Sequence, residues 1–176
     1  MYTESLQILI IALSAAMLGA AVYTDLRWGK IYNKLTIPCM MLGVTLNAGA
    51  YGLPGLLQSL GGAALVLALF LVLAPAAGIG GGDTKLMMAV GALIGFKLII
   101  WTMLFSALIG GVLALAVMAR HRALLATTRN MAGNIYTSAV LRAHVGLSSG
   151  SRGIKFRYSP AIALGTLLTF LLKWPA

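Results

Sequence analysis

The chain has 176 residues, of which 60% are hydrophobic and only 9% charged, and its 13 Lys and Arg outnumber its 3 Asp and Glu to give a net charge of +10. A soluble domain carries about a quarter charged residues, so this composition excludes an ordinary soluble enzyme, and its wealth of apolar residues excludes a disordered chain. The positive balance comes from scarce acids more than from abundant bases, so nucleic acid is not an expected partner. The length predicts a single domain over residues 1–176.

Six apolar runs approach the length of about 20 residues that a helix needs to cross a bilayer. They are Leu6–Tyr23, Leu35–Tyr51, Leu56–Ala77, Leu86–Phe96, Leu98–Ala119 and Ile162–Trp174. Backbone groups in hydrocarbon must be hydrogen-bonded within the protein, which favours helices for all six. The sequence therefore predicts an all-α, polytopic membrane protein, built as a bundle of six transmembrane helices.

Basic residues gather in the odd-numbered connections between these runs. Arg27, Lys30 and Lys34 follow the first run, Lys85 follows the third, and seven more lie in 120–157, so these connections hold 11 of the 13. By the positive-inside rule they face the cytoplasm, which predicts a protein of the inner (cytoplasmic) membrane. The 120–157 segment also carries apolar residues at helical spacing. It is predicted either as an amphipathic helix among anionic lipid headgroups or as a solvated connector.

Two of the three acidic residues stand at the cytoplasmic edge of this predicted bundle. Asp25 follows the first run closely, and Asp83 follows the glycines Gly80–Gly82 just before the fourth. Each has a structural explanation, since Asp25 could pair with Arg27 or Lys30 and Asp83 could cap a helix. A carboxylate at the membrane is costly, however, and usually serves a partner, a proton path or catalysis. Two in one bundle with so few acids favour a functional pair.

The chemistry of such a pair is specific. Two neighbouring carboxyl groups share a proton, so the ionised one can deprotonate water while the protonated one donates to a carbonyl oxygen. Peptide hydrolysis can then proceed without a metal or other cofactor. Gly80 and Gly82 would let the backbone approach a substrate closely. Lys85 could keep one aspartate ionised or steady a substrate carbonyl, or it could be an ordinary lysine at the membrane interface.

No metal site is predicted. Cys39 is the only cysteine and lies in an apolar run, which indicates a small buried hydrophobe. His121 and His144 have no other ligand-type residue nearby in the sequence.

Three strings resemble the prepilin peptidase family. Gly80-Gly81-Gly82-Asp83 fits the Gly-x-Gly-Asp motif of intramembrane aspartic proteases, and its continuation Thr-Lys-Leu fits prepilin peptidases. The Asp-Leu-Arg…Ile-x-Asn string from Asp25 and the Tyr-Ser-Pro-Ala-Ile-Ala-Leu-Gly string from Tyr158 extend the resemblance over nearly the whole chain. It implies that Asp25 and Asp83 are the catalytic residues of an aspartic endopeptidase. Its partners would be membrane lipid and a type IV prepilin or pseudopilin, whose leader peptide it would cleave at the cytoplasmic membrane face.

The size of the chain indicates which type of prepilin peptidase it resembles. Larger family members carry a four-cysteine zinc site and also N-methylate the pilin, and neither is expected in a chain with one cysteine. The minimal form resembles the Flp/Tad type of prepilin peptidase and, less closely, the archaeal preflagellin peptidases. The oligomeric state is left open.

Two alternative functions from other classes of protein remain open. In a proton-coupled small membrane transporter the two aspartates would be proton sites, although that class usually places them near the bilayer midplane within an inverted repeat. A non-catalytic membrane scaffold would explain the arginines but would leave the glycine–aspartate motif without a role.

Overall fold

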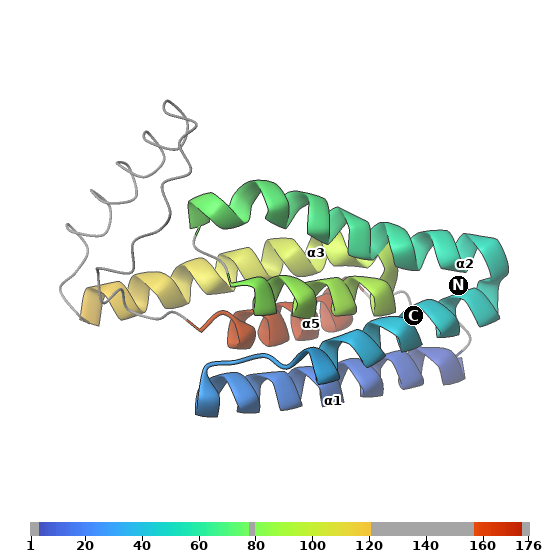
Figure 1. The fold of residues 1–176 in the computed structure, drawn as a ribbon, viewed down its shortest axis with the longest axis horizontal. Coiled ribbons are helices and arrows are strands. Elements are labelled where there is room, and N and C mark those ends of the chain that lie inside the picture. The colour runs from blue at the N-terminus through green and yellow to red at the C-terminus, as the bar shows by residue number, and fades with distance from the viewer. Residues whose placement is uncertain (1–3, 78–79, 121–156, 174–176) are drawn as a thin grey trace.

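The computed structural model describes residues 4–77, 80–120 and 157–173, and these residues form four helices and no strand (Figure 1). The helices are α1 (Glu4–Trp28), α2 (Asn33–Ala77), α3 (Gly81–Arg120) and α5 (Ser159–Lys173). Helices α1, α2 and α3 are long and apolar enough to cross a membrane, and α5 is a shorter apolar helix. The prediction of an all-α protein is thus confirmed for the described residues. The predicted amphipathic segment 120–157 lies outside them, apart from its two ends.

The sequence predicts six helices, whereas the described residues form four, of which α2 and α3 each consist of two helical segments joined at a kink. The predicted second and third runs are continuous in α2, joined at Gly52 between them. The fourth and fifth are continuous in α3, whose kink at Gly95 lies within the predicted fourth run. Gly52 has φ 61° and ψ −138°, and Gly95 has φ 81° and ψ 176°. Side chains with a Cβ rarely adopt such positive φ values, so each glycine lets the helix change direction within one residue. In Figure 1 both helices turn back on themselves.

Hydrogen bonds from both sides of Gly52 show that α2 folds back. The side-chain amide of Asn47, before the turn, donates to the carbonyl of Ala92 at 3.2 Å, and the hydroxyl of Ser59, after the turn, donates to the same carbonyl at 2.6 Å. Both polar side chains are buried, where an unpaired amide or hydroxyl would be costly. These bonds therefore fix how both parts of α2 lie against α3.

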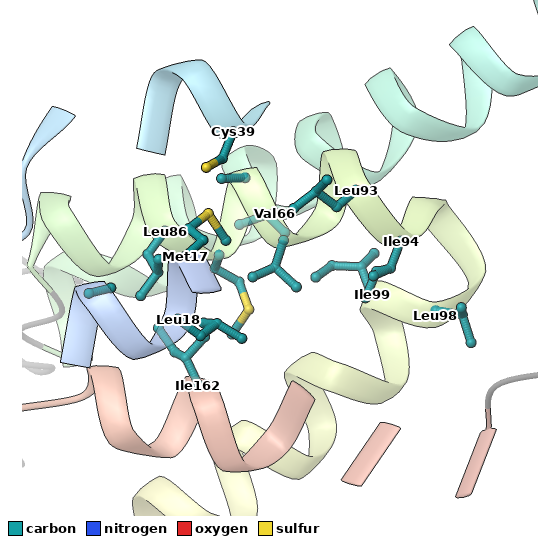
Figure 2. Packing of buried hydrophobic residues seen from close by; sticks show 14 of the residues in the cluster. Met17, Leu18, Cys39, Val66, Leu86, Leu93, Ile94, Leu98, Ile99 and Ile162 are labelled. Carbon is teal, nitrogen blue, oxygen red and sulfur yellow. The ribbon is translucent and has the colours of Figure 1, made fainter. Parts of the chain in front are cut away.

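All four helices contribute to one apolar core, which Figure 2 shows. Met17 of α1, Val66 of α2, Leu93 of α3 and Ile162 of α5 lie within it. The free thiol of Cys39 is buried there too, as the sequence predicts. Many large apolar side chains stay exposed on the outside of the bundle, which suits contact with lipid chains and not with water.

The chain direction places three helix ends together. Helix α1 runs toward one end of the bundle, at the left in Figure 1, and α3 and α5 both begin at that end. The last turn of α1 and the first turns of α3 and α5 are therefore neighbours, although they are far apart in sequence.

Candidate active site

Asp25 lies in the last turn of α1 and is only 7% exposed. Its Oδ2 atom accepts a hydrogen bond of 2.6 Å from the Ser159 hydroxyl. Arg27 turns away and donates to the Tyr23 hydroxyl at 2.7 Å, with its guanidinium 5.3 Å from the centre of the Trp28 ring. Asp25 thus forms no ion pair with a basic residue of the described chain, so the purely structural explanation offered for it does not hold.

Asp83 lies in the first turn of α3 and is half-buried. The Gly80 carbonyl accepts from the Thr84 N–H at 3.2 Å, which makes Gly80 the residue that caps the helix. In return the Gly80 N–H donates to the Asp83 carboxylate. This contact is one half of a capping box, in which a carboxylate on the third helical residue reaches back to the N–H of the cap, and Gly80 has no side chain to supply the other half. Asp83 therefore stabilises the start of its own helix as well as facing the site.

The three glycines before Asp83 are not equivalent. A Cβ on Gly80 would lie 3.2 Å from the Asp83 Oδ2 atom, and a Cβ on Gly82 would lie 3.2 Å from the Ile31 Cβ. Both distances are shorter than ordinary van der Waals contact, whereas a Cβ on Gly81 would meet nothing within 4 Å. The structure thus has close contacts at the first and third positions of the Gly-x-Gly-Asp string and open space at the second.

The two aspartates line one pocket with a volume of about 440 Å³. Its walls come from the end of α1, the residues that follow it, and the start of α3: Asp25, Gly29, Lys30, Ile31, Tyr32, Asn33, Gly80, Gly82 and Asp83. The carboxylates are close enough for their charges to repel. The structure therefore brings together four of the five predicted site residues, and Lys30 adds a cationic side chain to the lining.

Lys85, the fifth predicted residue, lies outside the lining. Its ammonium group donates to the Asn33 Oδ1 atom at 3.0 Å and so joins the start of α3 to the start of α2. Because Asn33 itself lines the pocket, Lys85 is linked to the pocket through this amide and not through a carboxylate.

A family model matches residues 12–115 of the chain, and its description is the type IV leader peptidase family. The chain belongs to this family. The match includes Asp25, Asp83 and the glycines Gly80–Gly82, which supports the resemblance seen in the sequence. No curated protein and no solved structure matches the chain.

The start of α5 is a part of this leader peptidase site that sequence reasoning missed. Ser159 contacts Asp25 as described, and Arg157 donates to the Leu26 carbonyl at 2.6 Å. Burial, and after it the charge on Asp83, raises the pKa of the Tyr158 phenol above its usual range, so this side chain stays neutral near the pair. These residues lie outside the matched range. The sequence signal was the string from Tyr158 to Gly165 that resembles the prepilin peptidase family, which does not by itself assign a role to Ser159.

No group of three His, Cys, Asp or Glu side chains that could hold a metal ion occurs within residues 4–77, 80–120 and 157–173. His121 and His144 lie outside the described residues.

Proposed function

We propose that this leader peptidase is an intramembrane aspartic endopeptidase that removes the leader peptide of Flp-type type IV prepilins. Cleavage would occur at the cytoplasmic face of the inner membrane. The observation that carries the proposal is the single pocket lined by both Asp25 and Asp83, two carboxylates that interact electrostatically.

The proposed reaction uses the pair as acid and base. One carboxylate takes a proton from a water molecule, whose oxygen attacks the carbonyl carbon of the scissile peptide, while the other carboxyl group donates its proton to the carbonyl oxygen. As the tetrahedral diol collapses, one of its hydroxyl groups returns a proton to the ionised carboxylate while the protonated one gives its proton to the leaving amine. One water is consumed, the peptide C–N bond breaks, and the two carboxyl groups end with the single shared proton they started with.

The pocket walls suit an extended peptide. Gly80 and Gly82 present backbone without side chains beside Asp83, so a substrate strand can approach the carboxyl group closely. A helical substrate segment has to unwind at the bond to be cut, because helical carbonyls are hydrogen-bonded within the helix. The apolar segment of a prepilin would remain helical against the exposed apolar side chains of the bundle.

The proposed orientation follows from charge. Lys30 lines the pocket, and Lys34, Lys85 and Arg157 lie near the same ends of the helices. Basic residues favour the cytoplasmic side of a membrane, so this end of the bundle is the one expected to face the cytoplasm. Water can then reach the pocket from that side.

The test is co-expression with an Flp-type prepilin, followed by measurement of leader removal. Asp25→Asn and Asp83→Asn keep the side-chain shape but remove ionisation, and each is expected to abolish cleavage. Glu4→Gln is the matched control, because it removes the only other acid, an exposed one at the far end of α1. If either Asn variant reaches the membrane at the normal level and cleaves at the wild-type rate, the mechanism is wrong. A pseudopilin and a preflagellin, offered as parallel substrates, test the preference for Flp pilins.

A further inference from the structure

The position of α5 is set by regular contacts with α3. Three residues of α3, each four apart and hence on one face, meet two residues of α5 and the residue just before it, in antiparallel order. The pairs are Thr102 with Thr169, Ser106 with Gly165, and Gly110 with Tyr158. The first pair is a buried hydrogen bond of 3.0 Å, and in the other two a Cβ on the glycine would collide with its partner. Helix α5 therefore cannot slide along α3 without losing these contacts.

This docking brings Ser159 to Asp25. The Tyr158 carbonyl accepts the N–H groups of Ala161 at 3.0 Å and Ile162 at 3.2 Å, so the helix begins at this point. Pro160 fixes its own φ and lacks an N–H, which is tolerated in a first helical turn. Ser159 is fully buried, and its hydroxyl donates to Asp25 across 134 positions of sequence and not to a neighbouring backbone group.

Each aspartate accepts a hydrogen bond, but the donors come from different parts of the chain. Asp83 accepts the N–H of Gly80, which precedes it in the chain, whereas Asp25 depends on a residue of another helix. The terminal torsion of an aspartate is broad, so a carboxylate without a directing bond samples many orientations. The Ser159 hydroxyl donates to the Oδ2 atom of Asp25 at 2.6 Å.

We propose that Ser159 is a positioning residue of this peptidase, whose hydrogen bond to Oδ2 fixes the orientation of the Asp25 carboxylate toward the substrate water. The proposal rests on the proposed function, since it presumes that Asp25 reacts. The packing of α5 on α3 then fixes the position of this hydroxyl. Arg157 supports the same placement, because it donates a hydrogen bond from just before α5 to the Leu26 carbonyl beside Asp25.

The experiment compares kcat and KM for prepilin cleavage by purified variants in the same detergent. Ser159→Ala removes only the hydroxyl. It is expected to lower kcat roughly ten- to a hundredfold, the size of a lost charge-assisted hydrogen bond in the transition state, with KM within about twofold of wild type. Ser159→Thr retains the hydroxyl and is expected to recover most of kcat.

The matched control is Ser106→Ala. This serine is equally buried, also lies in the α3–α5 contact, and its hydroxyl has no hydrogen-bond partner among the described residues. It is expected to leave both constants unchanged. A wild-type kcat for Ser159→Ala would overturn the proposal, as would an equal loss for Ser106→Ala, or a folded Ser159→Thr protein as slow as the alanine variant.

Failure of the inference and failure of the proposed function give different results. If the Asp25→Asn variant still cleaves prepilin, both the aspartic mechanism and the positioning role of Ser159 are refuted. If Asp25→Asn is inactive while Ser159→Ala is fully active, only the role of Ser159 is refuted.

Discussion

The close crossing of α2 and α3 at Gly62 provides a sharp test of the fold. A Cβ on Gly62 would lie 3.0 Å from the carbonyl carbons of both Gly91 and Gly95, and closer still to the Gly91 oxygen. These are backbone atoms, which cannot rotate away as the end of a flexible side chain can. Gly62→Ala is therefore expected to push the two helices apart and lower the stability of the bundle.

The neighbouring Gly61 allows the magnitude to be worked out. A Cβ on Gly61 would meet the Phe96 ring at 3.6 Å, which is ordinary contact. Both substitutions gain roughly 0.5–1 kcal/mol from replacing glycine by alanine within a helix, so this gain cancels between them. What remains is the collision at Gly62, and overpacking of this kind typically costs about 1–3 kcal/mol. At this chain length the difference corresponds to roughly 2–12 °C in the melting temperature.

The single cysteine supplies the assay. Cys39 is buried in the core, so a thiol-reactive fluorescent dye reports unfolding in detergent as the temperature rises. Gly62→Ala is expected to melt below Gly61→Ala, and circular dichroism should give the same order. Equal melting temperatures for the two variants, or a lower one for Gly61→Ala, would refute the close helix crossing.

Two further predictions concern the pocket. Gly82→Ala is expected to slow leader cleavage roughly tenfold because its Cβ would press on Ile31 in the pocket wall, while Gly81→Ala stays within about twofold of wild type; equal rates in the cleavage assay would contradict this. In Asp83→Asn the pKa of Tyr158 is expected to fall, because the negative charge that helps to raise it is gone. An ultraviolet titration, with Tyr158→Phe to identify the phenol, measures this shift, and an unchanged titration would show that the two groups do not interact.

The helical character of the chain could be predicted from the sequence, but the helix boundaries could not. Apolar runs separated by short polar or glycine-containing stretches indicated breaks near Gly52 and at Lys97, whereas the second turn in the structure lies at Gly95. Hydropathy does not distinguish a loop from one glycine with positive φ, since both interrupt a run in the same way. The direct bond from Ser59 to Ala92 depends on the turn at Gly52, and nothing local in the sequence indicates it.

The pocket could be predicted in outline, because both aspartates stand next to apolar runs that end or begin at the same side. Lys85 shows the limit of this reasoning. Its spacing of two residues from Asp83 suggested a partner for a carboxylate, yet two residues along a helix point in different directions. Its ammonium group instead reaches Asn33 on another helix. Ser159 could not be assigned a role for a related reason: its partner is 134 positions away, and only the docking of α5 on α3 brings them together.

The turn at Gly52 has a consequence for the chemistry as well as for the fold. A straight helix as long as the 45 residues of α2 would extend about 67 Å, at 1.5 Å per residue. It would place the start of α3, and Asp83 with it, more than a bilayer thickness away from the end of α1. Because α2 turns back at Gly52, its last residues return to the end where its first residues began, and Asp83 enters the pocket of Asp25. The pairing of the two carboxylates therefore depends on a glycine remote from the pocket, whose positive φ turns a long apolar helix back on itself.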